Sequence, residues 1–508
     1  MKCLTEAKHI VKINSKRLRK SNWDLHFTED EVLKRQEVVP LGESQLIRWL
    51  EELTAHEKQS LVKDYVLTVV FDSKTDFKRA CRGFKINDKE YLRLVGTTNQ
   101  VKKNGVLFVR KDLHTVITDR IDNGRDKTKP LVPAKFEAYR SLVASQSFPV
   151  SMPKGVIVVK DIETVFKDEV YYVDGSKGGR PTCELRKDFE VKLNANDGYG
   201  LCTVDLMKRW SKEVQENEGD DDEYFCGGVC LRNSFLKGMV FPFDLIKFAR
   251  EVAHTYEVID IWGDSHDIRD IELVLTESML KLWSAYSSME DYLSKCALNG
   301  YTFAICKVND RYLDDVRTLN YQYLQSYDLS DEDIVKLCQP TIDWITDALG
   351  RDYESTLKFL GVADREVTEG DLDYVQALKT NKEVLHDNFV FYKVARLLKK
   401  IIKNAKIGKL RCEGNYQIIG IDPYALCQGM FGLKITGILK RGEVYSSYWN
   451  DKGVKDIVLY RSPMTSHNNI RQVQVSNSEE CNKWFKYMKN VMMLNAWDTI
   501  TMALNGAD

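Results

Sequence analysis

Long apolar segments, paired cysteines and proline are all scarce in this chain of 508 residues. Its longest apolar runs, such as residues 65–71 and 155–159, are strand-sized and far below the ~20 residues that span a bilayer. Twelve cysteines are scattered without paired spacing, and the opening MKCLTEAKHIVK carries no apolar signal core. Ten prolines argue against long disordered linkers. These absences argue against a membrane protein and a disulfide-rich secreted protein, and they predict a cytoplasmic protein with reduced thiols.

The sequence also lacks an excess of either charge. Lys and Arg number 74 against 75 Asp and Glu, and hydrophobic residues make up 43% of the chain. Such a composition is typical of a soluble globular protein, and the length predicts two to four domains. Because bulk charge neither supports nor excludes a nucleic-acid partner, any surface for one has to come from local clustering of basic residues.

Hydrophobic periodicity predicts an α+β protein. Residues 1–150 mix helical patterns (43–65) and strand patterns (90–94, 106–109), and residues 151–252 turn mostly to strands around a DGYG turn at 197–200 and a helix at 203–214. Residues 253–400 are predicted to be a helical connector, with helices at 276–286, 289–298, 330–349 and 391–404. The third of these has a capping-type start at Ser330 and Asp333. Residues 401–508 return to strands at 445–449, 456–460 and 472–475, followed by a helix at 482–491.

Two motifs carry chemistry. The strand at 456–460 leads into a turn, Arg461-Ser462-Pro463, and the chain closes some tens of residues later on NGAD, which ends at Asp508. Earlier, the order of a strand, the DGYG turn, a short helix and a second strand leads to Arg232, with Lys237 five residues later. Alone, NGAD is more often a turn than a metal site, Arg461 could be only a turn residue before Pro463, and Lys237 could be only the end of a hairpin.

Taken together in this order, from about residue 135 to the end, the motifs resemble those of two-barrel RNA polymerases, most closely the single-chain phage type related to eukaryotic RNA-silencing RNA-dependent RNA polymerases. The resemblance implies two double-psi β-barrels, in 151–252 and 401–508, joined by the connector. In the second barrel of that family, an Arg-x-Pro turn precedes a D-x-D-G-D loop that holds the catalytic magnesium. Asp508 would be the first aspartate of this loop, so the chain is expected to be truncated inside it.

The resemblance also implies roles for individual residues. Lys237 falls on the lysine that reaches substrate phosphates, and Arg232 and Arg461 are expected to contact the NTP as well. Where multisubunit relatives have a second lysine, this chain has Val229. Asp508 is expected to ligate Mg²⁺, which prefers carboxylate oxygens. A basic run from residue 399 to 411 is expected to hold nucleic-acid phosphates without reading sequence, chiefly through Lys406, Lys409 and Arg411.

The sequence therefore predicts a nucleotidyltransferase that uses Mg²⁺, NTPs and a DNA or RNA template to make RNA, with no membrane partner, in the cytoplasm of a bacterial host if a phage encodes it. We favour a DNA template, although no residue distinguishes it from an RNA template. A non-catalytic nucleic-acid-binding or assembly protein that kept the barrels and lost the loop is the alternative. One carboxylate cannot hold a pair of metal ions, so these 508 residues alone are expected to be inactive.

Overall fold

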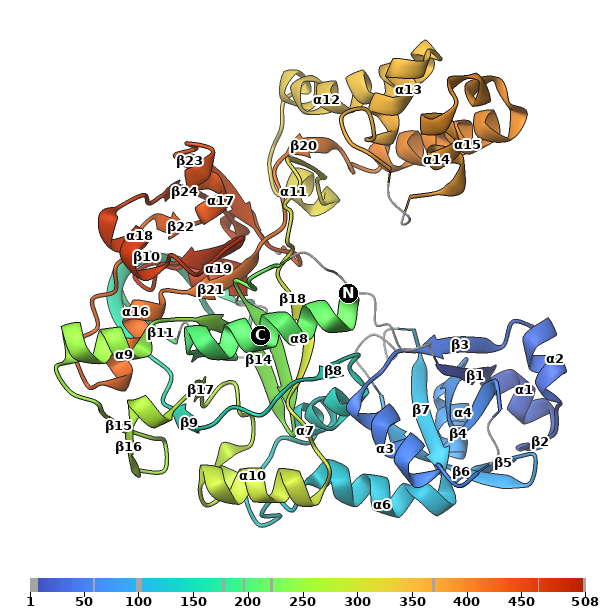
Figure 1. The fold of residues 1–508 in the computed structure, drawn as a ribbon, viewed down its shortest axis with the longest axis horizontal. Helices are drawn as coiled ribbons and strands as arrows, with labels where there is room; N and C mark the ends of the chain where they lie inside the picture. Colours follow the sequence, from blue (N-terminus) through green and yellow to red (C-terminus); the bar gives the residue numbers. More distant parts are fainter. Residues whose placement is uncertain are drawn as a thin grey trace. The chain divides into compact units, whose positions relative to one another are not determined.

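The computed structural model describes residues 8–57, 60–96, 103–175, 179–194, 197–219, 223–367, 371–464 and 466–505. The chain forms two compact units, and Figure 1 gives the labels of their helices and strands. The first unit comprises Met1–Arg311, Ile418–Lys455 and Gln474–Thr501, and the second comprises Tyr312–Gln417, Asp456–Val473 and Met502–Asp508. Each unit is therefore built from segments that lie far apart in the sequence.

The N-terminal part of the first unit is a mixed sheet with helices packed against it (Figure 1). Among the described residues its strand order is β2-β5-β6-β7-β4-β1-β3. The strands are β1 (Lys8–Asn14), β2 (Asp24–Leu25), β3 (Val38–Leu41), β4 (Val62–Val70), β5 (Phe84–Ile86), β6 (Lys89–Val95) and β7 (Gly105–Arg110). The helices are α1 (Ser15–Lys20), α2 (Glu29–Lys34), α3 (Gln45–Leu53), α4 (Lys74–Ala80), α6 (Lys111–Asp122), α7 (Pro133–Arg140) and the 3₁₀ turn η1 (Ser141–Ala144).

A second sheet follows, with the order β8-β18-β13-β14-β12-β17-β9 in the described part of the chain. Its strands are β8 (Phe148–Pro149), β9 (Val156–Val159), β12 (Tyr199–Cys202), β13 (Val229–Asn233), β14 (Leu236–Pro242), β17 (Leu273–Thr276) and β18 (Ala304–Val308). Successive side chains of β17 enter different cores: Leu273 and Leu275 pack with α3, α6 and α8 (Val204–Glu218), whereas Val274 packs with C-terminal elements. Because both faces of the sheet are covered in this region, β9, β12 and β17 are buried along their whole length.

A third sheet, with the order β21-β25-β22-β24-β23, is built near the C-terminus. Its strands are β21 (Ile418–Ile421), β22 (Glu443–Tyr445), β23 (Asp456–Tyr460), β24 (Ile470–Val475) and β25 (Val491–Leu494). The boundary between the two units falls within β24. The helices of this part are α16 (Pro423–Met430), α17 (Ser447–Asp451), α18 (Glu479–Trp484) and α19 (Ile500–Asn505), with the 3₁₀ turn η6 (His467–Asn469).

The second and third sheets share one strand topology. Ranked by sequence, the strands β9, β12, β13, β14 and β17 stand in the spatial order 1-5-2-4-3, and β21 to β25 stand in the same order. The directions match too: the first pairing of each series is parallel, the second antiparallel and the third parallel. The chain therefore builds the same arrangement of strands twice.

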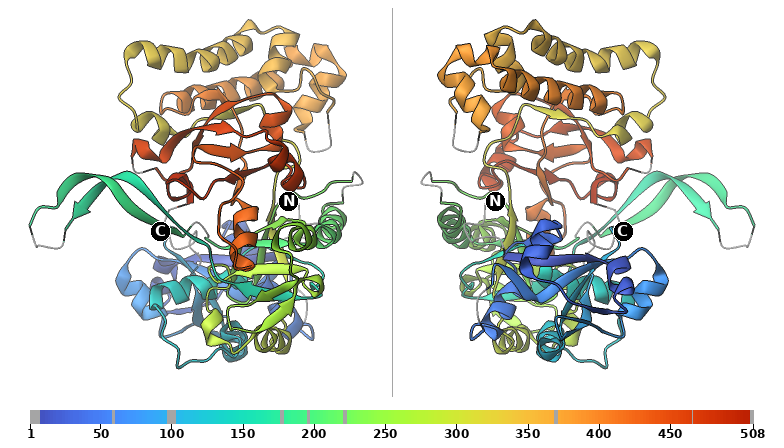
Figure 2. Two further views of the ribbon diagram at one scale, coloured as in Figure 1. Left: turned by 90° about the vertical axis from the view of Figure 1, so that its left-hand side faces the viewer. Right: turned by 90° about the vertical axis from the view of Figure 1, so that its right-hand side faces the viewer.

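Two antiparallel ribbons complete the first unit. β10 (Glu163–Asp174) and β11 (Thr182–Asn194) form a long ribbon that projects away from the sheets (Figure 2), and β15 (Glu257–Ile259) pairs with β16 (Ser265–Asp267). The base of the long ribbon is held by Thr164, whose hydroxyl donates to the Ala496 carbonyl oxygen at 2.6 Å. The remaining helices of this unit are α9 (Leu245–Phe248), the π-helical turn η2 (Ala249–Ala253), η3 (Ile268–Asp270), η4 (Trp283–Ala285) and α10 (Met289–Leu298).

The second unit is mainly helical. Its helices are α11 (Tyr321–Gln325), α12 (Asp331–Gly350), α13 (Tyr353–Leu360), α14 (Asp373–Thr380), η5 (Lys382–His386) and α15 (Asn388–Ala405). The short strands β19 (Val316–Thr318) and β20 (Arg411–Glu413) pair where the chain enters and leaves these helices. Ser330 begins α12 with the predicted capping box, in which its hydroxyl and the Asp333 carboxylate bond to each other's backbone N–H groups.

The structure confirms a mixed α+β fold and corrects some predicted elements. Residues 276–286, predicted to be a helix, contain the end of β17 and only a 3₁₀ turn, because these apolar residues fill the core beside β14. Residues 445–449 form the end of β22 and the start of α17, and the predicted helix at 482–491 ends at Trp484. The domain boundaries at residues 150, 252 and 400 stay a prediction. In the described residues, no helix is both long and apolar enough to span a membrane.

Candidate active site

Lys237 and Arg232 lie on the hairpin that joins β13 to β14. They are direct partners in the antiparallel register of the two strands, so the sequence spacing of five residues brings them side by side. Lys237 is exposed and Arg232 is half-buried. Among the described residues, no carboxylate lies within ion-pair distance of the Lys237 ammonium group. Lys237 is therefore a cation that can meet a ligand without first breaking an ion pair.

Two glycines fix the position of this hairpin. Gly198, in the predicted DGYG turn, has a φ of +70°, and a Cβ there would lie 2.5 Å from the Lys237 carbonyl oxygen. A Cβ on Gly238 would clash with the Gly198 carbonyl oxygen and would lie 2.8 Å from Cγ of Met279. The Met239 N–H donates to that same carbonyl at 2.8 Å. The DGYG turn thus packs backbone to backbone against the lysine-bearing strand, which only glycine allows.

Two cysteine thiols accompany Arg232. Its guanidinium donates to the Leu231 carbonyl oxygen at 2.8 Å and lies 3.1 Å from the Cys230 sulfur. A hydrogen bond from the Cys306 thiol on β18, and then the charge of Arg232, lower the pKa of the Cys230 thiol to about 6. The same hydrogen bond and burial raise the pKa of Cys306. The Leu231 carbonyl oxygen and the Cys230 sulfur already contact the Arg232 guanidinium, so Lys237 is the stronger candidate for a phosphate contact.

Arg461 lies directly after β23, in the predicted Arg-x-Pro turn. The turn contains a cis peptide bond between Ser462 and Pro463. The Arg461 guanidinium donates to the Leu504 carbonyl oxygen at 2.8 Å, in the last turn of α19. The Asn469 side-chain amide donates to the neighbouring Ala503 carbonyl oxygen at 3.2 Å. The structure therefore brings the Arg-x-Pro turn to the helix that leads into NGAD, although more than 40 residues separate them.

Asp508 and its neighbours 506 and 507 lie outside the described residues. Within the residues that are described, no group of three or more His, Cys, Asp or Glu side chains is placed to hold a metal ion. The described residues therefore do not make the expected Mg²⁺ site by themselves, and the metal assignment of Asp508 stays a prediction.

The residues of the basic run differ in exposure. Lys406 and Lys409 are exposed at the end of α15 and beyond it. Arg411, on β20, is half-buried, and the carbon atom of its guanidinium lies 4.7 Å from the centre of the Trp344 ring. The stacking of Arg411 on Trp344 has a packing role of its own, so Lys406 and Lys409 are the better phosphate contacts of the three.

The structure adds polar residues that the sequence reasoning missed. The Ser278 hydroxyl accepts a hydrogen bond from the Gly198 N–H at 3.1 Å and donates to the Asp161 carboxylate at 2.8 Å. Lys281 lies 3.5 Å from the Asp197 carboxylate, and its backbone N–H donates to the Phe235 carbonyl oxygen in the hairpin turn. These residues hold the DGYG turn and the hairpin together, but they come from three segments, and no spacing in the sequence could have revealed them.

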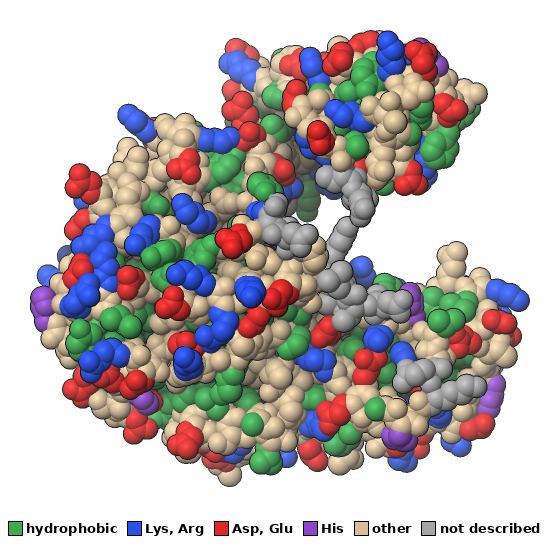
Figure 3. Space-filling view, viewed as in Figure 1, with side chains coloured by type: hydrophobic (Ala, Val, Ile, Leu, Met, Phe, Trp, Pro, Cys, Tyr) green, Lys and Arg blue, Asp and Glu red, His purple; other side chains and the backbone are tan. Residues whose placement is uncertain are grey.

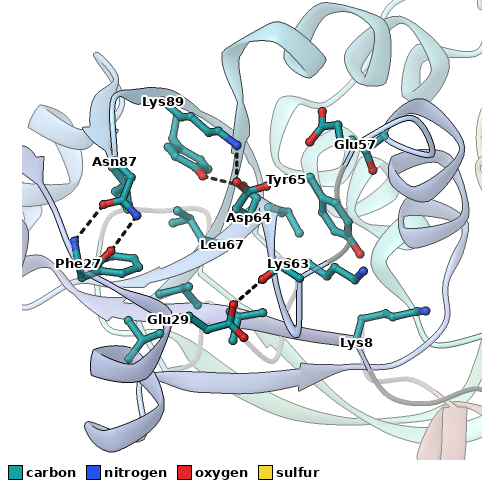
Figure 4. A pocket seen from close by; sticks show the side chains of 18 of the residues that line it. Lys8, Phe27, Glu29, Glu57, Lys63, Asp64, Tyr65, Leu67, Asn87 and Lys89 are labelled. Atoms are coloured by element: carbon teal, nitrogen blue, oxygen red, sulfur yellow. Dashed lines mark hydrogen bonds and ion pairs between the residues drawn. The ribbon is translucent and has the colours of Figure 1, made fainter.

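A cavity of about 650 Å³ lies elsewhere, in the N-terminal sheet (Figure 4). Its charged side chains are of both signs and partly paired: Lys89 lies 2.5 Å from Asp64, and Glu29 accepts from Ser60 at 2.5 Å. It contains none of the predicted site residues. On the face shown in Figure 3, Lys and Arg side chains also lie among Asp and Glu side chains, as the net charge of −1 leads one to expect.

No protein-family model matches the chain, but the comparisons with curated proteins and with solved structures both give matches. The sequence is 28% identical over 470 residues to the DNA-directed RNA polymerase YonO of Bacillus phage SPbeta, which covers 89% of this chain and 51% of that protein. The fold matches the RNA-dependent RNA polymerase QDE-1 from Thielavia terrestris with a TM-score of 0.51 and 13% identity, over 90% of this chain and 47% of that one.

The predicted resemblance to phage-type RNA polymerases is confirmed. The chain is related in sequence to a phage DNA-directed RNA polymerase, and it shares its fold with an RNA-dependent RNA polymerase. It spans about half the length of the curated relative that it matches.

Proposed function

We propose that this chain is part of a nucleic-acid-templated RNA polymerase and carries its NTP-contacting residues. The hydrogen bond between Arg461 and Leu504 is the observation that supports this best. It joins the two halves of the motif on which the resemblance to polymerases depends, the Arg-x-Pro turn and the segment that leads into NGAD. Nothing in the order of the sequence alone requires this contact, so it is independent support for the motif.

We also propose that the second and third sheets are the two barrels that the resemblance implies. Their shared strand order, 1-5-2-4-3, and their matching pattern of parallel and antiparallel pairs support a common architecture. In this scheme β13 and β14 correspond to β23 and β24. The hairpin that carries Lys237 then corresponds to the segment that carries Arg461, which is consistent with a similar role for the two cations.

The chemistry fits these residues. Addition of a nucleotide joins a 3′-hydroxyl to the α-phosphate of an NTP, and negative charge spreads over the phosphoryl oxygens in the transition state. Lys237 would bind the phosphates as a compact point charge, whereas the fork of Arg461 can grip two oxygens or a ribose edge. Arg232 would contribute more weakly because its guanidinium already contacts the Cys230 sulfur and the Leu231 carbonyl oxygen. Fixed cations of this kind cost no reorganisation when the charge develops.

The resemblance assigns Mg²⁺ to Asp508 and to two further aspartates after it. When bound, such ions lower the pKa of the attacking hydroxyl and neutralise the leaving pyrophosphate. The inactivity of these 508 residues by themselves depends on the same metal assignment and stays a prediction. Lys406 and Lys409 would neutralise phosphates of the template strand or of the product strand.

Template-directed synthesis by the complete gene product tests the proposal. Matched DNA and RNA templates of one sequence, each with a labelled RNA primer, are incubated with NTPs and Mg²⁺. We expect the primer to be extended, and we expect the DNA template to be used better, as the name of the phage relative suggests. Extension on the RNA template alone would identify an RNA-dependent enzyme. Absence of extension on both, with binding retained, would contradict the proposal and favour a non-catalytic binding protein.

A further inference from the structure

One face of α15 is strongly cationic and has no catalytic assignment. The helix, NFVFYKVARLLKKIIKNA, contains no acidic residue. Its cations recur every three or four positions and therefore share one face. All of them are exposed. They are Lys393, Arg396, Lys399, Lys400 and Lys403 within the helix, and Lys406 directly after it. We call this set the α15 basic face.

The opposite side of α15 is occupied by the core of the second unit. Ile401 is buried against Ala348 and Phe359, and Val394, Leu397 and Leu398 pack on the same cluster. The apolar stripe of the helix is therefore already covered. This argues against a membrane surface as the partner, because a helix that binds a bilayer has to insert its apolar face.

The cations of the α15 basic face form no ion pairs with the described residues of the chain. In the described part of the chain, no carboxylate lies within 4.0 Å of any of them, whereas nearby cations such as Lys336 and Arg365 pair with Glu332 and Asp371. Like charges at this spacing repel each other along a helix and destabilise it. Six uncompensated cations on one face therefore point to an anionic ligand that lies along the helix.

Aromatic rings continue the same face toward the start of the helix. Tyr392 is 70% exposed and Phe389 is 57% exposed. The Lys393 ammonium group lies 4.8 Å from the centre of the Phe389 ring. From Phe389 to Lys406 the face is about 25 Å long, because a helix rises 1.5 Å per residue. Rings exposed in line with cations are the combination on which single-stranded nucleic acids bind, with bases stacked and phosphates neutralised.

We propose that the α15 basic face, together with Phe389 and Tyr392, binds single-stranded nucleic acid. Duplex is disfavoured as the ligand because its bases are already stacked and leave no ring face for Tyr392. The inference rests on the proposed function only for the identity of the bound strand, which would be the template or the product of the polymerase. The binding itself needs neither NTP nor catalysis, and it can be measured separately.

Fluorescence anisotropy of a labelled 20-nucleotide oligo(dT), titrated with the protein at several salt concentrations, tests this. If all six cations engage, log K should fall with log salt at a slope of about −4, using about −0.7 per phosphate of a single strand. The triple variant Lys399→Glu/Lys400→Glu/Lys403→Glu should bind at least about tenfold more weakly and lose about 2 from the magnitude of that slope. Tyr392→Ala should weaken binding about fivefold or more with the slope unchanged, because stacking is not ionic.

Matched controls separate the face from general charge. Lys111→Glu/Lys208→Glu/Lys212→Glu makes the same change of charge on exposed lysines of the first unit, and Tyr312→Ala removes a tyrosine that is 76% exposed. Both controls should bind like the unaltered protein. Circular dichroism checks that each variant folds. If the Lys→Glu triple variant does not fold, the neutral variant Lys399→Gln/Lys400→Gln/Lys403→Gln takes its place in the titration.

Three outcomes would overturn the inference. The first is that the α15 variants and the controls bind oligo(dT) with equal affinity and an equal salt slope. The second is that the protein prefers a 20-base-pair duplex and that Tyr392→Ala does not change its affinity. The third is that the protein binds vesicles containing phosphatidylserine and that the α15 variants lose this binding while oligonucleotide binding is unchanged. Failure of the polymerase proposal would show instead in the primer-extension assay, with oligonucleotide binding intact.

Discussion

At the scale of single residues, the account depends on which cations are free to act. Lys237 is exposed and has no carboxylate partner among the described residues, whereas the Arg232 guanidinium already contacts the Cys230 sulfur and the Leu231 carbonyl oxygen. Arg461 is already engaged by a carbonyl oxygen, and among the described residues no carboxylate lies within 4.0 Å of its guanidinium. We therefore expect Lys237 and Arg461 to contribute more to NTP binding than Arg232 does.

Replacement of Arg461 tests its double role. Arg461→Ala removes a charged hydrogen bond to α19 and the proposed NTP contact, each of which is typically worth 1.5–3 kcal/mol. We expect kcat/KM for NTP incorporation by the complete gene product to fall about tenfold to several hundredfold. Arg269→Ala, which removes an arginine that is 57% exposed and paired with Asp267, is the matched control. Equal activity of Arg461→Ala and the unaltered protein would remove Arg461 from the site.

The candidate residues themselves could be proposed from the sequence, because the Arg-x-Pro turn and the strand that carries Lys237 are local motifs. The contacts that surround these residues could not be predicted from the sequence. Cys230 and Cys306 meet across two strands that are more than 70 residues apart, and their spacing gives no sign of it. The exposure of Lys237 and the stacking of Arg411 on Trp344 likewise depend on packing.

At the scale of elements, the crossing of the DGYG turn over β14 sets the position of Lys237. Gly238→Ala would drive a methyl group into the Gly198 carbonyl and Met279. We expect a loss of about 3 kcal/mol in the free energy of unfolding, typical of an overpacked site, and a lower yield of extended RNA. Thermal and urea unfolding measure the first effect, and primer extension measures the second.

Gly175→Ala is the control for that change. Nothing lies within 4 Å of a Cβ built at Gly175, so the added methyl group should be nearly neutral. If Gly238→Ala were as stable as Gly175→Ala, the close backbone contact would not be what holds the hairpin in place.

An ion pair that anchors α8 gives a pH dependence. Arg209 on α8 donates to both carboxylate oxygens of Glu272, at 3.2 and 2.8 Å, and lowers the pKa of that carboxyl, as does the Lys154 N–H. A depressed folded-state pKa stabilises the protein above the unfolded pKa of about 4.3 and loses this contribution as pH falls through the folded value.

Glu272→Gln should therefore lower the free energy of unfolding by about 1–2 kcal/mol at pH 7. This is less than the loss of a fully buried charged hydrogen bond, because Arg209 is about one-third exposed. The gap in unfolding temperature between Glu272→Gln and the unaltered protein should narrow as the pH is lowered from 6 to below 4. A gap independent of pH would mean that the pair does not contribute through its charge.

The sequence predicted elements well where periodicity and caps agreed, as in α8, α10, α12 and α15. It failed where apolar residues at helical spacing serve a sheet or a core. Residues 276–286 have such spacing, yet Met279 and Leu280 line the core beside β14, and Leu280 forms a bridge to Leu236. Short apolar runs do not distinguish a helix from a buried strand, and tertiary packing decides between them.

At the scale of the whole molecule, the repeated strand topology is the feature that the sequence concealed. No internal repeat is visible in the residues, yet the second and third sheets have the same strand order and the same pattern of directions. Strand order is fixed by how buried faces meet, and many apolar sequences satisfy one topology. In the sequence, only the turns that contain the motifs indicated the repeated topology, because their chemistry restricts them to particular residue types.

The most direct test of the central claim is single-nucleotide incorporation by the complete gene product with and without Lys237. On a primed template with saturating Mg²⁺, we expect Lys237→Ala to lower kcat/KM for NTP by at least about tenfold, the value of one charged phosphate contact. Lys208→Ala, which removes a lysine that is 64% exposed on α8, should have no effect. Wild-type incorporation by Lys237→Ala would contradict the assignment of the β13–β14 hairpin to the active site.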